Sequence, residues 1–311
     1  MRILITGAAG FLGFNLSKKF LAEGHLVTGL DDFTTGSAKH VKELESFENF
    51  RFLFQDVREP LHGNFEGILN FACPASPVHY QADPVRTLET NFLGMVNVLR
   101  LAKDLNARVL QASTSEVYGD PLISPQIESY WGNVNPIGIR SCYDEGKRAA
   151  ETLCYDYLRQ HKMDIRVIRI FNTYGPGMAI GDGRVVSNFI VQALKGEDLT
   201  IYGAGTQTRS FCYVSDLIDG IYATFVNRDN LKSPINLGNP KEYTMIELAE
   251  HIVDATKSKS KIVYESLPSD DPKQRCPDIS LAKSQLSWEP KTNLEDGIHK
   301  TVDYFRNLLR Q

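Results

Sequence analysis

The feature that most constrains the fold is a short apolar run that leads directly into spaced glycines near the start of the chain. Residues 3–5 are apolar, residues 7–13 read GAAGFLG, and Leu16, Phe20 and Leu21 follow at helical spacing. A strand, a tight glycine turn and a helix in this order form the first unit of a parallel α/β sheet. The glycines let the backbone approach a pyrophosphate, and the helix N-terminus offers it free N–H groups. Because the spacing is GxxGxxG and not GxGxxG, the turn predicts a dinucleotide site only together with other signals.

An acidic residue provides such a signal. A second apolar run, residues 26–30, ends at Asp31, 18 positions after Gly13. A carboxylate at this place accepts hydrogen bonds from an adenosine ribose. It also repels a 2′-phosphate, and residues 32–36 contain no arginine that would offset the repulsion. We therefore predict that the cofactor is NAD and not NADP.

Short apolar runs alternate with longer helical patterns in the first half of the chain, which is typical of βαβ units. Beyond residue 171 glycine-rich loops separate shorter elements, and helical patterns return at 215–225, 245–255 and 294–309. We expect an α/β fold, a Rossmann-type doubly wound parallel sheet with a smaller, partly interleaved C-terminal substrate domain. The predicted nucleotide domain is 1–172 with 211–240, and the predicted substrate domain is 173–210 with 241–311. The predicted strands are residues 3–5, 26–30, 52–54, 68–71, 109–111 and 166–170, and a predicted helix covers 85–99.

The composition narrows the class of protein. The net charge of −4 and the lack of Lys/Arg runs predict no binding to nucleic acid or to an anionic membrane. The first strand begins at once after Met1 and no apolar stretch reaches the ~18 residues of a membrane span, so we expect a cytoplasmic protein. The five cysteines have no CxxC spacing and the seven histidines no metal-ligand spacing, so we expect free thiols and no metal.

A tyrosine and a lysine four positions apart form the candidate catalytic group. Tyr143 is the only tyrosine followed by a lysine at this distance, and Ala150 and Leu153 indicate that the segment is helical. Both side chains then lie on one helix face. An ammonium favours the ionised form of a phenol, whose ordinary pKa is ~10, so Lys147 should lower the pKa of Tyr143 and let it accept a hydroxyl proton. The polar run 113–116 after a predicted strand belongs at the same sheet edge, where ligands bind.

These motifs resemble those of the extended short-chain dehydrogenase/reductase family that acts on nucleotide sugars. The resemblance rests on GxxGxxG, Asp31, the segment STSEVYG at 113–119, and Tyr143 with Lys147. Within that family the chain is similar to the UDP-glucuronate decarboxylases over nearly its whole length. The segments that carry this similarity are CPASP at 73–77, YWG at 130–132, NP at 135–136, CYDEGKR at 142–148 and DGRVVSNF at 182–189.

The resemblance implies a reaction and the residues that perform it. Oxidation of UDP-glucuronate at C4 by NAD makes a β-keto acid, which loses CO2; protonation at C5 and reduction at C4 then give UDP-xylose. A homodimer through helices that include 85–99 and Tyr143 is also implied. The implied catalytic residues are Thr114, Ser115, Glu116, Tyr143 and Lys147. The implied cofactor contacts are Gly7, Gly10, Phe11, Leu12, Gly13, Asp31, Asp32, Thr35, Gly36, Asp56, Val57, Phe71, Ala72, Tyr143, Lys147 and Thr173. The implied substrate contacts are Tyr80, Ser115, Glu116, Asn172, Val186, Tyr202, Arg209 and Arg275.

The residues by themselves leave three candidate functions open. Besides the decarboxylase, a nucleotide-sugar 4-epimerase or 4,6-dehydratase would use the same Tyr143 and Lys147. The dehydratases typically carry Asp where this chain has Ser115, and a serine cannot be the acid that expels a C6 hydroxyl at neutral pH. Epimerases usually lack the equivalent of Glu116. A non-catalytic NAD sensor would not need the proton-transfer residues Thr114, Tyr143 and Lys147.

Overall fold

A seven-stranded sheet, parallel throughout, organises the chain in the computed structural model, which describes residues 1–229, 231–266 and 274–310. The strand order is β11-β6-β5-β4-β1-β2-β3, with the reversal between β1 and β4 that defines a doubly wound sheet. The fold class predicted from the sequence is therefore confirmed. The strands are β1 (Arg2–Thr6), β2 (Leu26–Asp31), β3 (Phe50–Phe54), β4 (Gly67–Asn70), β5 (Arg108–Thr114), β6 (Ile165–Ile170) and β11 (Ile235–Leu237).

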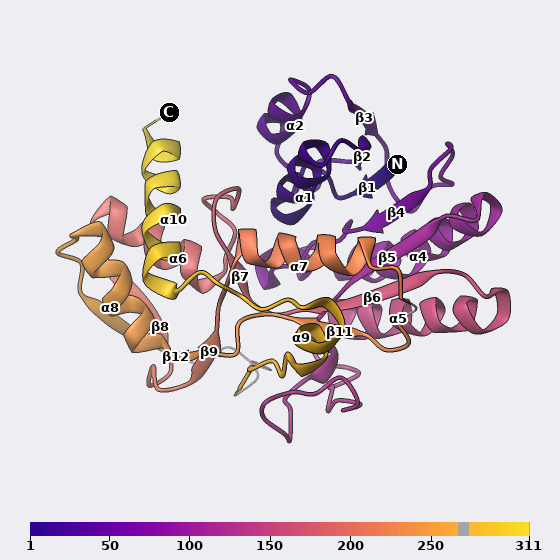
Figure 1. Cartoon of the computed structure of the whole chain (residues 1–311). Helices are drawn as coiled ribbons and strands as arrows, with labels where there is room; N and C mark the ends of the chain where they lie inside the picture. The colour runs from indigo at the N-terminus through magenta and orange to yellow at the C-terminus, as the bar shows by residue number, and fades with distance from the viewer. Residues whose placement is uncertain (230, 267–273, 311) are drawn as a thin grey trace.

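Helices cover both faces of this sheet, as Figure 1 shows. The helices α4 (Pro84–Leu105) and α5 (Ser141–His161) pack on one face, and α1 (Phe11–Ala22) and α7 (Val214–Val226) pack on the other. Successive residues of a strand point to opposite faces of the sheet. Leu4 and Val109 belong to the hydrophobic cluster under α4 and α5, while Ile3 and Leu110 belong to the cluster under α1 and α7. Side chains that alternate between two covered faces explain why these strands are apolar throughout.

Two glycines shape the turn between β1 and α1. Gly7 has φ +70°, and a Cβ there would lie 2.7 Å from the carbonyl carbon of Phe71. A Cβ on Gly13 would lie 2.0 Å from the carbonyl oxygen of Gly7. The Thr6 hydroxyl donates to Asn70 Oδ1 at 2.7 Å, which ties the ends of β1 and β4 together. Glycine is therefore required at both positions, because this turn and the start of α1 touch each other.

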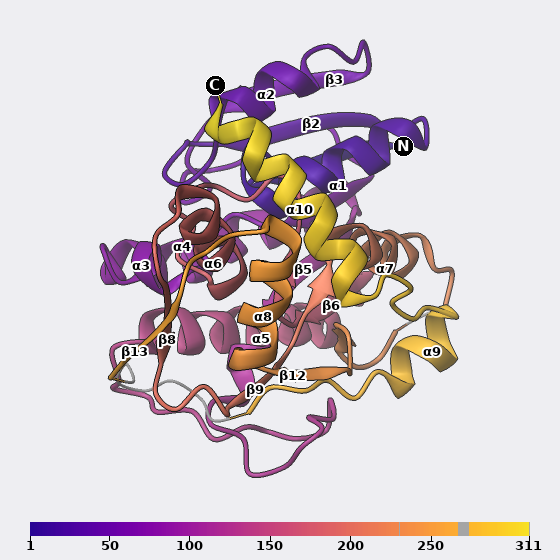
Figure 2. The same ribbon diagram turned by 90° about the vertical axis from the view of Figure 1, so that its left-hand side faces the viewer.

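A second group of elements packs beside the sheet. Figure 2 shows α6, α8 and α10 close together, and three two-stranded sheets (β7 with β10, β8 with β13, β9 with β12) accompany them. Between these elements the chain returns to the large sheet through α7 and β11, so the two groups are interleaved. These elements are β7 (Thr173–Tyr174), α6 (Val185–Lys195), β8 (Leu199–Tyr202), β9 (Thr208–Ser210), β10 (Cys212–Tyr213), β12 (Glu242–Thr244), α8 (Met245–Thr256), β13 (Ile262–Glu265) and α10 (Leu294–Leu309). The short helix α9 (Ser280–Leu286) packs instead against β11 of the large sheet and against α7.

The predicted elements agree with the observed ones to within a few residues, except that the helix predicted at 85–99 continues to Leu105, and some elements were not predicted. β11 is only three residues long, and α2 (Ala38–Leu44), α3 (Pro77–Tyr80) and the 3-10 turn η1 (Ser115–Tyr118) are also short. The domain limits at 172, 210 and 240 stay a prediction, and residues 230, 267–273 and 311 of the predicted domains lie outside the described residues. In the described part of the chain, no helix is both long and apolar enough to cross a membrane.

A buried ion pair joins α5 to the sheet behind the site. Glu151 of α5 lies 2.8 Å from the Nη2 atom of Arg169 of β6, and both side chains are about nine-tenths buried. The Ser113 hydroxyl donates to Glu151 at 2.5 Å, and Arg169 donates to the Tyr118 hydroxyl at 2.9 Å. Glu151 lies one helical turn beyond Lys147, so this network holds the part of α5 that carries the candidate catalytic lysine.

Candidate active site

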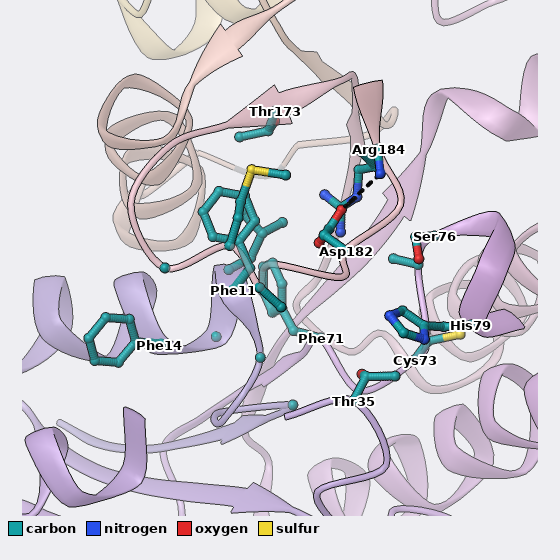
Figure 3. A pocket seen from close by; sticks show the side chains of 18 of the residues that line it. Phe11, Phe14, Thr35, Phe71, Cys73, Ser76, His79, Thr173, Asp182 and Arg184 are labelled. Atoms are coloured by element: carbon teal, nitrogen blue, oxygen red, sulfur yellow. Dashed lines mark hydrogen bonds and ion pairs between the residues drawn. The ribbon is translucent and has the colours of Figure 1, made fainter. Parts of the chain in front are cut away.

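A cavity of about 590 Å³ lies at the carboxyl ends of β1, β4, β5 and β6. Figure 3 shows Phe11 and Phe71 on one side of it, and Asp182 and Arg184, from the loop before α6, on another. A smaller pocket of about 70 Å³, lined by the end of β2, adjoins the large one, since Gly7, Gly10, Thr35, Phe71 and Cys73 line both. This is the edge at which ligands bind in open α/β sheets.

The glycine turn fits a dinucleotide. Gly10 is the N-cap of α1 and has no side chain that could accept from the helix, and the first turn of α1 carries no acidic residue. Arg184 lies 5.9 Å from the centre of the Phe11 ring at the start of α1. The free N–H groups of the helix, its partial positive charge and an arginine thus face the same part of the cavity, which suits a diphosphate.

Asp31 lies at the end of β2, where a ribose contact was predicted. Its carboxylate accepts from the backbone N–H of Ala9 at 2.9 Å and from that of Phe33 at 2.8 Å. Burial raises the pKa of Asp31, although the two backbone hydrogen bonds act in the opposite direction. The carboxylate is therefore held against the glycine turn and faces the smaller pocket.

Most of the predicted cofactor contacts line these two pockets. Gly36 lines neither: a Cβ there would lie 2.8 Å from Asp31 Oδ1, so it packs directly against the Asp31 carboxylate. The predicted contacts that line the large cavity are Gly7, Gly10, Phe11, Leu12, Gly13, Thr35, Phe71, Tyr143, Lys147 and Thr173. Those that line the smaller pocket are Gly7, Gly10, Asp31, Asp32, Thr35, Asp56, Val57, Phe71 and Ala72.

Tyr143 and Lys147 lie side by side on α5 and both line the cavity. Lys147 Nζ is 5.6 Å from the centre of the Tyr143 ring and donates to the carbonyl of Ala112 at 2.9 Å. Burial raises the pKa of Tyr143 and lowers that of Lys147, and a hydrogen bond with the Thr114 side chain acts to lower the pKa of the phenol. The expected lowering of the Tyr143 pKa is therefore corrected, because burial raises this pKa and outweighs the Thr114 hydrogen bond and the Arg184 charge that act to lower it. Added positive charge in the cavity would be needed to make this phenol a base.

Two arginines hold Glu116, which lines the cavity from η1. Arg140 Nη2 lies 2.8 Å from Glu116 Oε2, and Arg275 Nη2 contacts the same oxygen. Burial acts to raise the pKa of Glu116, but the two guanidinium groups outweigh it and hold this pKa below its usual value. Glu116 is therefore a charged group in the wall of the cavity.

A second buried carboxyl lies behind this group. Asp144 follows Tyr143 on α5, is 7% exposed, and its Oδ1 atom has no hydrogen-bond partner among the described residues. Burial and the charge of Glu116 raise the pKa of Asp144 to about 7, although Arg140 and Arg275 act to lower it. Asp144 therefore keeps its proton in mildly acidic solution, where an ordinary aspartate has lost it.

This raised pKa makes stability depend on pH. Between about pH 4 and pH 7 the folded protein binds a proton at Asp144 that the unfolded chain has lost, so the free energy of unfolding should fall as pH rises. Asp144→Asn should remove this fall. Between pH 4.5 and 7.5 the free energy of unfolding of the variant should therefore rise by roughly 2 to 4 kcal/mol relative to that of wild type. Urea unfolding at several pH values measures the difference. Asp104→Asn, at an exposed position of α4, is the control and should follow wild type; an Asp144→Asn curve parallel to wild type would contradict the prediction.

The structure places the predicted substrate contacts at different depths. Asn172, Ser115 and Glu116 line the cavity, whereas Tyr80 lies behind Tyr143, with ring centres 5.1 Å apart and planes at 8°. Arg209 and Arg275 form a backbone bridge and are both buried. Val186 is buried on α6, and Tyr202 is half exposed at the end of β8. The substrate roles of all these residues stay predictions.

Several site residues were not predicted. Arg184 lies 2.9 Å from Asp182 and lines the cavity, and Arg140 and Asp144 flank Glu116. Asp182, Arg184 and Asp144 belong to segments that carried the family resemblance, which was the available signal. In the described part of the chain, no three His, Cys, Asp or Glu side chains are placed to hold a metal ion.

Known proteins resemble the chain in sequence over nearly its full length. UDP-glucuronic acid decarboxylase 1 of Xenopus tropicalis is 53% identical over 99% of this chain and 73% of that protein. UDP-glucuronic acid decarboxylase 3 of Arabidopsis thaliana is 54% identical over 98% of this chain and 89% of that protein. The resemblance to this group of enzymes inferred from short motifs is thus confirmed by the whole sequence.

The fold is also shared with a solved complex. The UDP-glucuronic acid 4-epimerase of Bacillus cereus, solved with UDP-glucuronic acid and NAD, is 27% identical, with a TM-score of 0.88 over 99% of this chain and 100% of that one. The model of the NAD dependent epimerase/dehydratase family matches residues 3–238, a span that contains the glycine turn, Asp31, Glu116, Tyr143 and Lys147. With that match and a doubly wound sheet that brings these residues to one edge, the chain belongs to the NAD dependent epimerase/dehydratase family.

Proposed function

We propose that the protein is an NAD-dependent decarboxylase that converts UDP-glucuronate into UDP-xylose. The observation that carries the proposal is the grouping of Ser115 and Glu116 beside Thr114, Tyr143 and Lys147 in one cavity, with two arginines bound to Glu116. The identity of more than half of the residues with enzymes named UDP-glucuronic acid decarboxylases supports it.

The proton acceptor in this reaction is Tyr143. When bound, NAD supplies a hydride acceptor and a positively charged ring. Positive charge near the Tyr143 phenol lowers its pKa, and the Thr114 hydroxyl stabilises the ionised phenolate. Tyr143 then takes the C4 hydroxyl proton as C4 is oxidised, and Lys147 stabilises the resulting charge. The same phenol returns the proton to O4 at the end of the reaction.

Carbon dioxide leaves because the C4 ketone lies β to the C5 carboxylate. The C5–carboxylate bond breaks and its electron pair moves into an enolate, whose charge on O4 Tyr143 stabilises. The Ser115 hydroxyl can donate to the carboxylate that leaves. Protonation at C5 restores the sugar carbon before C4 is reduced, so no net oxidation occurs.

Product mass tests the proposal. Incubation with UDP-glucuronate and NAD should release CO2 and give a UDP-pentose of correspondingly lower mass. An unchanged mass with inversion at C4 would overturn the proposal in favour of a 4-epimerase, the activity of the Bacillus cereus neighbour. Loss of water instead of CO2 would identify a dehydratase, although Ser115 stands at the position of the acid that this reaction needs.

Glu116 should control the proton that reaches C5. Because its carboxylate is ionised, it can orient a water molecule that donates the proton to C5, so Glu116→Gln should slow protonation of the enolate and decrease turnover by about 10²-fold. In D2O the variant should release CO2 faster than it incorporates deuterium at C5, which mass spectrometry of the product follows over time. Thr200→Val, on β8 outside the cavity, is the control. Wild-type deuterium incorporation by Glu116→Gln would exclude this role.

We further propose that the protein is a homodimer through α4. Val85 is 68% exposed on this helix, and Leu88, Phe92 and Leu93 are 42–44% exposed at helical spacing. An apolar stripe of this kind on a long helix is suited to burial against another helix. Sedimentation equilibrium should give twice the mass of the chain.

A further inference from the structure

An arginine from a distant part of the chain lies beside the predicted ribose site. Arg86 is in the first turn of α4, and its Nη2 atom lies 2.6 Å from Asp32 Oδ2, 3.1 Å from Asp56 Oδ2 and 3.2 Å from the Thr34 hydroxyl. All four residues line the smaller pocket together with Asp31. Residues 32–36 contain no arginine, so the fold supplies one that the local sequence lacks.

The carboxylates at this pocket outnumber the arginines. Arg58 pairs with Asp56 at 2.8 Å and contacts Glu89 at 2.5 Å, so its positive charge is already paired with carboxylates. Arg86 is shared between Asp32 and Asp56. Three carboxylates, those of Asp31, Asp32 and Asp56, therefore line the pocket together with one guanidinium group, that of Arg86. An additional dianion at the ribose would meet excess negative charge and an arginine that is already paired.

We propose that Arg86 is a specificity-determining residue for the nucleotide, and that its capture by Asp32 and Asp56 keeps it from a 2′-phosphate and so favours NAD over NADP. A guanidinium forms paired hydrogen bonds with phosphate oxygens, which is how NADP sites accommodate the 2′-phosphate. Arg86 has a guanidinium that could bind a phosphate and lies at a suitable place, but this guanidinium is already bound by the Asp32 and Asp56 carboxylates. The inference rests on the proposed NAD-binding function of this site.

Asp32 is the residue whose replacement isolates this effect. Asp56 is also bound by Arg58 through both Nε and Nη2, so its replacement would disturb a second ion pair. The other oxygen of Asp32, Oδ1, accepts from the backbone N–H of Thr34 at 2.8 Å. An asparagine oxygen can keep that hydrogen bond, so Asp32→Asn removes the charge and preserves the turn.

A double-mutant cycle on the full chain tests the inference. NADH and NADPH titrations, followed by nucleotide fluorescence, compare wild type, Asp32→Asn, Arg86→Ala and the double variant. Asp32→Asn should raise the affinity for NADPH relative to the affinity for NADH about five- to tenfold, as expected for release of one partly exposed ion pair. The double variant should show no such increase in NADPH affinity. Glu89→Gln is the control, because it removes a nearby charge that pairs with Arg58 and not with Arg86.

Each other outcome has a definite meaning. An equal NADPH gain in Asp32→Asn and in the double variant would show that the charge of Asp32 acts alone, and this overturns the role of Arg86. The same gain in Glu89→Gln would overturn it too, since any lost carboxylate would then suffice. A wild-type chain that binds neither nucleotide would overturn the proposed NAD-dependent function, whereas wild-type NADH binding with no gain in Asp32→Asn overturns only the inference.

Discussion

Tyr143→Phe should lower turnover of UDP-glucuronate by roughly 10³-fold, because proton transfer by a positioned side chain contributes rate factors of this size. The change removes one hydroxyl and leaves the ring stacked on Tyr80 and beside the Lys147 ammonium. Oxidation at C4 requires loss of the hydroxyl proton, and within the cavity this phenol is the group that hydrogen-bonds to Thr114. Initial rates of CO2 release and the Kd for NADH measure the effect. The Kd should change little, because the shape of the site is kept.

A second tyrosine on the same helix provides the matched control. Tyr155 is also largely buried on α5 but does not line the cavity, so Tyr155→Phe should turn over at nearly the wild-type rate. A Tyr143→Phe enzyme that kept more than a tenth of the wild-type rate would show that another group accepts the proton. The proposed mechanism would then be wrong even if the product were UDP-xylose.

Glu151→Ala should lower the free energy of unfolding by about 3 to 5 kcal/mol, the usual cost when one partner of a buried ion pair is removed. Arg169 would keep its charge in the interior with its carboxylate partner gone, and the Ser113 hydroxyl would lose its acceptor. Equilibrium urea unfolding measures this loss. Because the pair joins α5 to β6 near Lys147, turnover at a temperature where the variant is folded should fall as well.

An exposed pair on α5 shows whether burial is the cause. Asp156 and Arg159 lie 2.5 Å apart, but both side chains are more than half exposed. Asp156→Ala should change the free energy of unfolding by less than about 1 kcal/mol, because water already screens this pair. If Glu151→Ala and Asp156→Ala had equally small effects, the buried network would not be what holds α5 to the sheet.

Local signals in the sequence were enough to predict most strands of the sheet and the Tyr143–Lys147 pair. Runs of apolar residues covered on both faces predict the strands near Ile3 and Val109, and helical spacing places Tyr143 and Lys147 on one face. β11 could not be found in this way, because three residues have no periodicity, and its place beside β6 comes from pairing with a strand 67 residues earlier in the register Ile235 to Ile168.

The sequence by itself determined the α/β class, the glycine turn that only glycine can form, Asp31 at the end of the second strand, and the Tyr143–Lys147 pair. These features depend on residues a few positions apart, whose relative placement follows from strand and helix geometry. Only the tertiary structure decided that Arg140 and Arg275 meet at Glu116, that burial raises the pKa of Tyr143, and that Arg86 reaches Asp32. The physical reason is that charge interactions and desolvation depend on distance in space, and Arg275 and Glu116 are 159 positions apart in the chain.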